Sequence, residues 1–269
     1  MSEPATPRMG ANAPAWRQKL YRAFAGRYVA RRGATPDGRF DALVSAGAQL
    51  SVLDPRGVPI DPVHTRFIAH WVRADSVIWD VGANMGLFAL PAALKANAGQ
   101  VYCFEPDIDL AHHLLKATRR PINRGLPVAV LPFALSDEDG VAEFLIADHG
   151  TSMNKLAGAG PWHDGLFVAR ETRRVATLRI DAIASKLRPP DIVKIDVEGA
   201  EMRVLEGGRA TIAKARPVML VEGPKELAPQ IDAYLKALDY VILDGEVEKP
   251  VPLDSIVWDT VAIPKEKWR

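Results

Sequence analysis

Cysteine is almost absent from this sequence. Cys103 is the single cysteine among 269 residues, so an intramolecular disulfide is impossible and a zinc site built on several cysteines is excluded. The chain also lacks any apolar run of the roughly 18–20 residues that a transmembrane helix needs. Charge of one sign is not in excess, because 34 Lys and Arg face 33 Asp and Glu. This balance argues against binding to nucleic acid through bulk charge, since such domains usually carry a basic excess.

The N-terminal segment differs in composition from the rest. Residues 1–13 are rich in Ala, Pro and small polar residues and show no apolar periodicity, which predicts a flexible leader. From Trp16 to Tyr28 apolar side chains recur at helical spacing, and residues 1–33 carry seven Lys or Arg against one acid. Three interpretations stay open: a helix that caps the domain, a helix that makes peripheral contact with an anionic membrane or substrate surface, and a targeting peptide.

The body of the chain alternates between short Val- and Ile-rich runs and segments with helical spacing. This alternation predicts βαβ units and a mostly parallel sheet covered by helices on both faces. The predicted strands are 77–81, 100–105, 127–135, 191–196, 217–222, 240–245 and 256–263, and helices are predicted within 86–98 and 107–120. A polar, Pro-containing segment joins the last two strands and predicts an antiparallel hairpin at one edge. We expect a helical and extended cap over residues 14–74 and the main domain over 75–269.

The strongest local signal lies where the strand 77–81 passes into a helix. The strand contains Asp80 near its end, a tight turn follows with Gly82 and Gly86, and an apolar helix begins. Glu105 ends the next strand, at the place where a doubly wound nucleotide site puts the acid that binds ribose hydroxyls. In open α/β sheets ligands collect at the carboxyl ends of the strands, so this turn is the predicted ligand site.

The chemistry of the turn narrows the ligand. It lacks the full G-x-G-x-x-G pattern that seats a dinucleotide pyrophosphate against a helix. Asp80 would repel a phosphate and attract a cation such as an amino group or a sulfonium. The turn therefore favours an adenosine ligand with a cationic, phosphate-free tail. S-adenosylmethionine fits this description and NAD fits poorly.

Five blocks in fixed order resemble the FkbM-type methyltransferases. They are D-V-G-A-N-M-G at 80–86, F-E-P-D at 104–107, A-L-S-D at 134–137, T-L-R-I-D at 177–181 and V-K-I-D-V-E-G-A-E at 193–201. The resemblance covers residues 75–225. It implies a class I methyltransferase, Rossmann-like fold with a seven-stranded sheet, S-adenosylmethionine as cofactor, and O-methylation of a small molecule, natural product or sugar.

The resemblance also implies roles for individual residues. Asp80 and the Gly82–Gly86 turn, with Ala83 within it, would hold the methionine portion, and Asn84 would add a polar contact. Glu105 would bind both ribose hydroxyls. The remaining cofactor residues are predicted at the adenine: Asp107, Leu135, Ser136 and Asp137. For Ser136 and Asp137 a turn with local side-chain hydrogen bonds is an equal alternative.

Acidic residues also cluster after the strand 191–196. Asp196 falls at the strand's carboxyl end, with Glu198 in the turn and Glu201 at a helix start. One carboxylate could act as general base for an acceptor hydroxyl, or Asp196 with a glutamate could bind Mg²⁺ or another divalent metal. The structural alternative is that Glu201 favours the helix dipole and Glu198 pairs with Lys194. Glu222, which closes the next strand, is a second candidate base, so the catalytic candidates are Asp196, Glu222 and Glu198.

The acceptor side is predicted in the Gly-rich, polar segment 148–165 between the runs 141–147 and 172–178. Its polar residues, including His149, Asn154 and His163, suit a small-molecule or glycan acceptor, and no nucleic acid partner is expected. Two other function classes stay open: a binding module that holds the cofactor without turnover, and a nicotinamide oxidoreductase. A cytoplasmic location is the simplest expectation, and the sequence favours no particular oligomeric state.

Overall fold

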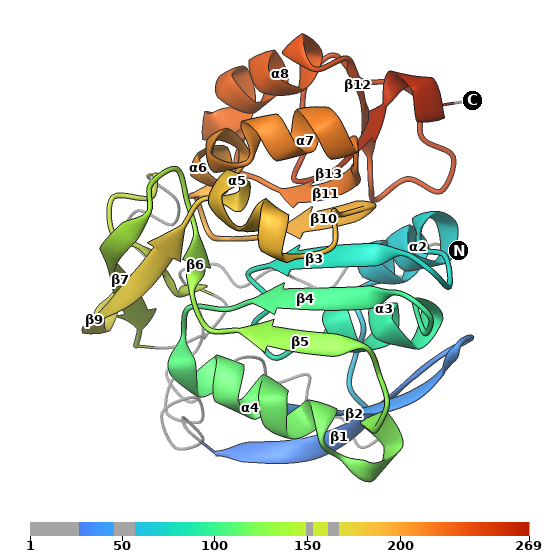
Figure 1. The fold of residues 1–269 in the computed structure, drawn as a ribbon, viewed down its shortest axis with the longest axis vertical. Helices are drawn as coiled ribbons and strands as arrows, with labels where there is room; N and C mark the ends of the chain where they lie inside the picture. The colour runs from blue at the N-terminus through green and yellow to red at the C-terminus, as the bar shows by residue number, and fades with distance from the viewer. Residues whose placement is uncertain (1–26, 46–56, 149–152, 161–166, 269) are drawn as a thin grey trace, which may run out of the picture.

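The computed structural model describes residues 27–45, 57–148, 153–160 and 167–268. Within these residues the largest element is a seven-stranded sheet, called here the central sheet, in the order β12-β13-β11-β10-β3-β4-β5 (Figure 1). Its strands are β3 (Val77–Val81), β4 (Gln100–Phe104), β5 (Val128–Leu131), β10 (Ile192–Ile195), β11 (Val218–Glu222), β12 (Tyr240–Asp244) and β13 (Asp259–Pro264). β13 runs antiparallel to both its neighbours, and the other pairings are parallel. This confirms the predicted fold class, with the antiparallel strand placed between β11 and β12.

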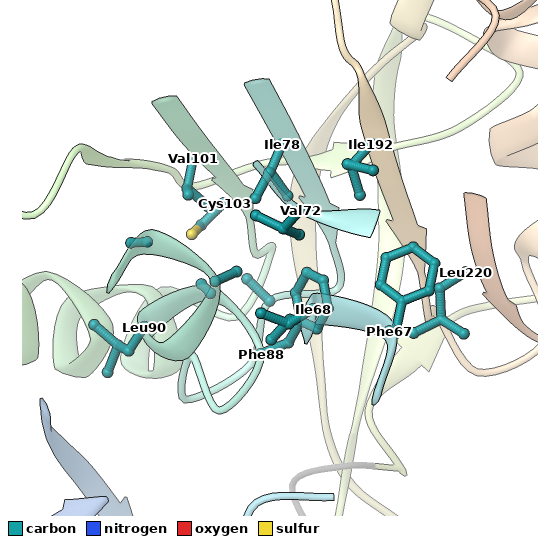
Figure 2. Packing of buried hydrophobic residues seen from close by; sticks show 14 of the residues in the cluster. Phe67, Ile68, Val72, Ile78, Phe88, Leu90, Val101, Cys103, Ile192 and Leu220 are labelled. Carbon is teal, nitrogen blue, oxygen red and sulfur yellow. The ribbon is translucent and has the colours of Figure 1, made fainter. Parts of the chain in front are cut away.

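Alternating side chains of the strands build two separate cores, one on each face of the central sheet. Ile78 and Cys103 face the first core, which packs on α2 (Pro62–Trp71), α3 (Ala89–Lys95) and α4 (Ile108–Thr118), as Figure 2 shows for α2 and α3. Trp79 and Phe104 face the second core. That core packs on α5 (Ile180–Ile183), α6 (Glu201–Gly207), α7 (Arg209–Ala215) and α8 (Ala228–Ala237). Both faces are buried, which explains why the strands read as continuous apolar runs.

Ahead of the central sheet, β1 (Tyr28–Thr35) and β2 (Gly38–Ser45) form an antiparallel hairpin. Tyr28 therefore begins a strand, and its predicted place on a helical face is wrong. The turn Pro36-Asp37-Gly38 explains the hairpin, because proline presets the first turn angle and Gly38 adopts φ 143°. Phe40, the largest apolar side chain of β2, lies in the core with α3 and α4. The predicted leader 1–13 and the predicted helix from Trp16 lie outside the described residues.

A second, smaller sheet stands at the carboxyl ends of β3, β4 and β5, where the strand arrows in Figure 1 point. In the described residues this small sheet has the order β6-β9-β7-β8. Its strands are β6 (Ala134–Leu135), β7 (Gly140–Ala147), β8 (Lys155–Leu156) and β9 (Ala169–Leu178). The run 127–135, predicted as one strand, is split between the two sheets. Pro132 lies at the break, since a proline has no N–H for the ladder.

Candidate active site

A cleft opens between the carboxyl edge of the central sheet and the small sheet. It encloses about 590 Å³ of space free of protein atoms, part of it open to solvent. Six predicted site residues line it: Gly82, Asn84, Glu105, Leu135, Asp196 and Glu198. The small sheet contributes Phe144 and Leu156, and the preceding loop contributes Asn154.

The turn after β3 is held by protein contacts on both sides. The Gly82 and Ala83 N–H groups both donate to the Phe104 carbonyl, at 3.0 and 3.1 Å. Gly82 has φ 80°, and a Cβ on it would lie 1.8 Å from the Asp196 carbonyl oxygen. Gly86 has φ 78°, and a Cβ there would lie 2.4 Å from a Leu114 methyl group. The two glycines are therefore required by the close approach of neighbouring protein segments. Packing within the protein is by itself enough to explain their spacing in the sequence.

Asn84 and Glu198 both line the cleft and have strained backbones. Asn84 has φ 49° and Glu198 has φ 56°, the left-handed region that side chains with a Cβ rarely adopt. The Asn84 Oδ1 is buried and has no hydrogen-bond partner among the described residues. Strain of this kind gathers at ligand sites because the surrounding structure fixes the side chain there.

Glu105 is buried at the end of β4 and is tied to the turn. Its Oε2 accepts the Asn84 N–H at 2.7 Å and its Oε1 accepts the Asp107 N–H at 2.8 Å. Burial raises the pKa of Glu105 to about 8, although these two N–H donors lower it. The carboxyl group thus lines the cleft with its orientation fixed by two backbone groups.

Lys194 lies between two carboxylates beneath the cleft. It is paired with Asp80 in the β10–β3 register, and both side chains point to the face that carries α2 and α3. Its Nζ lies 2.8 Å from Asp196 Oδ2, 3.4 Å from the Gly82 carbonyl and 3.7 Å from Asp80 Oδ1. Burial opposes the charge of Lys194, but Asp196 and Asp80 outweigh it and raise the lysine pKa. The acids paired with this lysine are thus Asp196 and Asp80, whereas the structural alternative from the sequence named Glu198 as its partner.

Asp80 is wholly buried and does not line the cleft. Neither carboxylate oxygen makes a hydrogen bond within the described part of the chain. Burial raises the pKa of Asp80 to about 6, against the opposing effect of Lys194. Its predicted contact with the methionine portion stays a prediction, and the contact seen here is with Lys194.

The acids after β10 divide into two groups. Glu201 is buried, and its Oε1 accepts the Gly199 N–H at 3.0 Å and the Val197 N–H at 3.3 Å. Burial raises the pKa of Glu201 to about 7. Glu201 therefore shapes the loop, as the structural alternative expects, whereas Asp196 and Glu198 face the cleft.

Glu222, at the end of β11, lies outside the cleft lining. The Trp258 indole N–H donates to its Oε1 at 2.8 Å. Burial, followed by the charge of Asp196, raises the pKa of Glu222 to about 8. It belongs to the charged group around Lys194 but presents no surface to the cleft.

Three predicted adenine residues also lie outside the lining. Ser136 is buried and donates to Asp137 at 2.9 Å, a local turn contact. Asp107 caps α4 by accepting the Asp109 N–H at 2.9 Å, and it pairs with Arg173 of β9. Arg173 and the apolar wall from the small sheet were missed by the sequence reasoning. The alternation of residues 141–147 predicts a strand, but no local sequence pattern shows that this strand pairs with β9.

Two further features concern the described residues alone. No group of three or more His, Cys, Asp or Glu side chains is arranged there to hold a metal ion, so the divalent-metal interpretation gains no support. Of the helices described, none has the length and apolar character needed to cross a bilayer.

Replacing Lys194 by methionine should destabilise the protein strongly. Asp80 and Asp196 would lose their shared cation, and breaking a buried ion pair typically costs about 3–5 kcal/mol in free energy of unfolding. Urea denaturation measures the change, with the exposed Lys186→Met as matched control. The loss should shrink in acid, where protonation removes the Asp80 charge, and in the Asp80→Asn/Lys194→Met double variant. A Lys194→Met protein as stable as the wild type would contradict the role of this lysine.

Methyltransferases are among the known proteins that are similar in sequence to this chain. The chain is 31% identical over 147 residues to the hexuronic acid methyltransferase AglP of Haloferax volcanii, which covers 53% of this chain and 54% of that protein. It is 26% identical over 175 residues to the 2-O-methyltransferase NoeI of Sinorhizobium fredii, covering 61% and 70%. The chain thus spans about half the length of the Haloferax relative.

A solved structure gives a further similarity. Methyltransferase FkbM from Methylobacillus flagellatus matches with a TM-score of 0.49 and 19% identity, over 76% of this chain and 48% of that one. At the level of sequence, the family model for the methyltransferase FkbM domain matches residues 80–242, which is more than half of the chain. The resemblance seen in the motifs is confirmed, and the chain belongs to the FkbM methyltransferase domain family.

Proposed function

We propose that this chain is an S-adenosylmethionine-dependent methyltransferase that methylates a hydroxyl oxygen on a small molecule or sugar. The carrying observation is the chemistry of the cleft. Three acidic side chains, Glu105, Asp196 and Glu198, line it, and no Lys or Arg of the described residues does so. Such a lining suits a ligand with a cationic centre and disfavours a pyrophosphate. Residues 75–269 would form the catalytic domain, with 14–74 as its cap.

The lining fits the cofactor in three parts. Glu105 would accept the ribose hydroxyls, since each of its oxygens keeps a lone pair beyond the backbone bond. Leu135, with Leu110 and Phe144, offers an apolar surface for the adenine ring. The Asn84 Oδ1, which has no hydrogen-bond partner among the described residues, is a suitable acceptor for the ammonium group of the methionine portion. When bound, S-adenosylmethionine supplies an electrophilic methyl group and leaves as S-adenosylhomocysteine.

Asp196 is the best-placed base for the acceptor. Its carboxylate lines the cleft, and Lys194 fixes it through a 2.8 Å hydrogen bond to Oδ2. As the acceptor oxygen bonds to the methyl carbon, its proton passes to this carboxylate, which removes charge from the developing oxonium. The remainder of the catalysis is alignment of oxygen, methyl carbon and sulfur in a line. Glu222 would affect the reaction indirectly, through its electrostatic interaction with Lys194, which in turn holds Asp196.

The names of the relatives support a sugar hydroxyl as acceptor. One is a hexuronic acid methyltransferase and another a 2-O-methyltransferase. The first test is titration calorimetry with S-adenosylhomocysteine and with NAD, on the wild type and on Glu105→Ala. A second test follows labelled methyl transfer to hexuronates and neutral sugars.

We expect binding of S-adenosylhomocysteine, weakened in Glu105→Ala, and no binding of NAD. Binding without turnover on a broad acceptor set would favour the cofactor-binding module instead. Binding of NAD in preference would favour the nicotinamide oxidoreductase and refute the proposal.

Asp196→Asn should remove turnover while leaving cofactor binding in place. Loss of a general base usually costs about 100-fold or more in kcat. We expect Glu222→Gln, whose carboxyl is outside the cleft, to lose about tenfold or less. Both variants are compared for kcat at saturating cofactor and for S-adenosylhomocysteine affinity. A larger loss in Glu222→Gln than in Asp196→Asn would transfer the role of base to Glu222.

Cofactor affinity should rise with pH. The ligand-free pKa of Glu105 is raised to about 8, whereas the bound form needs the carboxylate to accept ribose hydroxyls. Binding therefore releases a proton, and the affinity should increase from about pH 6 to about pH 8.5, by at most about tenfold per pH unit. Calorimetry in buffers of different ionisation enthalpy measures the proton directly. The Glu105→Gln variant should lose this dependence, and an affinity that falls as pH rises would contradict the assignment.

A further inference from the structure

The small sheet covers the cleft but belongs to a separate ladder. Phe144 of β7 and Leu156 of β8 line the cleft, and both strands belong to the small sheet. The position of this wall of the proposed cofactor site therefore depends on how the small sheet is attached to the rest of the domain. Polar connections to α4 and to the end of β4 hold it there, beside the apolar packing of Phe144, Ile146 and Leu156 against Ala200.

Arg173 is the first connection. It lies on β9 opposite Phe144, and its side chain is 21% exposed. Its Nη1 lies 2.9 Å from Asp107 Oδ1, and its Nη2 lies 2.9 Å from Asp109 Oδ2, both at the start of α4. Glu171 on the same strand binds its Nε at 2.8 Å and is the largest contributor to its raised pKa. The guanidinium thus joins the small sheet to the first turn of α4.

Asn154 makes the second connection to the same aspartate. Its Nδ2 donates to Asp107 Oδ2 at 2.9 Å, and its Oδ1 accepts the Ala147 N–H at the end of β7 at 2.9 Å. Both oxygens of Asp107 are therefore held by the small sheet or the loop beside it. Burial raises the pKa of Asp107, whereas the Asp109 N–H and the charge of Arg173 lower it.

Asp107 also contacts Glu105, the proposed ribose ligand, and so links the small sheet to it. Its N–H donates to Glu105 Oε1 at 2.8 Å, and Pro106 alone separates the two residues in sequence. Proline fixes the backbone angle between them, so a shift of Asp107 moves the Glu105 carboxylate with it. The sequence of contacts runs from β9 through Arg173 and Asp107 to Glu105.

We propose that Arg173 is a positioning residue for the cofactor, which holds the small sheet over the cleft and fixes the Glu105 carboxylate through Asp107. The inference rests on the proposed function, because it takes Glu105 as the ribose ligand. Arginine suits this task because its planar fork binds two carboxylates at once, which a lysine ammonium does less well. Arg173 is not among the residues that line the cleft, so its removal should weaken binding and spare the chemical step.

The test compares Arg173→Gln and Arg173→Lys with Arg174→Gln. Arg174 is the matched control, because it is the next residue on β9, is exposed and points to the opposite face. In Arg173→Gln we expect S-adenosylhomocysteine affinity to fall about tenfold or more, with kcat at saturating cofactor within about threefold of wild type. The affinity of Arg173→Lys should lie between those of the wild type and Arg173→Gln, and the affinity of Arg174→Gln should equal that of the wild type. Asn154→Ala should weaken binding in the same direction and add less than its full effect to Arg173→Gln.

Hydrogen exchange supplies a measurement that does not use the cofactor. Exchange should become faster in Arg173→Gln at the amides of β7 and at Asp107, and stay unchanged in Arg174→Gln. Wild-type affinity in a folded Arg173→Gln protein would overturn the proposal. So would a fall in apparent kcat that matches the fall in the folded fraction of the protein, because partial unfolding would then explain the loss. Absence of S-adenosylhomocysteine binding by the wild type would overturn the proposed function as well, whereas an effect-free Arg173→Gln in a binding protein overturns this inference alone.

Discussion

The buried Lys194 stabilises two acidic side chains, Asp80 and Asp196, at the carboxyl edge of the central sheet. Asp80 sits in the interior of the sheet without a hydrogen bond among the described residues, and Asp196 faces the cleft beside it. Two carboxylates in a region of low dielectric repel each other and lose hydration, so both need a cation at close range. Lys194 provides it from the neighbouring strand, 2.8 Å from one acid and 3.7 Å from the other. The position of the candidate base therefore follows from the register of β10 on β3.

The same register sets the backbone around the site. Gly82 turns directly beneath the Asp196 carbonyl, with room for no side chain, so the turn after β3 and the loop after β10 must move together. The Asn84 N–H then reaches Glu105 on the next strand. Glu105, the turn and Asp196 are thereby fixed relative to one another by backbone contacts, which suits the proposed reaction because it depends mainly on alignment.

The sequence predicted the parts of the site that depend on local order. Strand ends and acids recur at fixed spacing, so Glu105 and Asp196 could be placed at the carboxyl edge, and both line the cleft. It could not predict contacts between distant segments. Arg173 meets Asp107 from 66 positions away, and Phe144 reaches the cleft only because β7 pairs with β9. Tyr28 was misplaced because an apolar residue fits a helical stripe and a strand equally well until the Pro36-Asp37-Gly38 turn is recognised.

The electrostatics of the ligand-free cleft also bear on the direction of the reaction. Burial raises the pKa of Glu105, which lines the cleft, and of Glu222, which lies outside it, to about 8. In the proposed reaction, a sulfonium bound in the cleft would favour the ionised form of Glu105 and would be attracted to Asp196 and Glu198, which also line it. The thioether that remains after methyl transfer is neutral at sulfur, so this attraction is lost once the methyl group has moved. In the proposed reaction, an acidic cleft therefore favours the substrate form of the cofactor over the product form, with Lys194 too firmly paired to substitute for the lost charge.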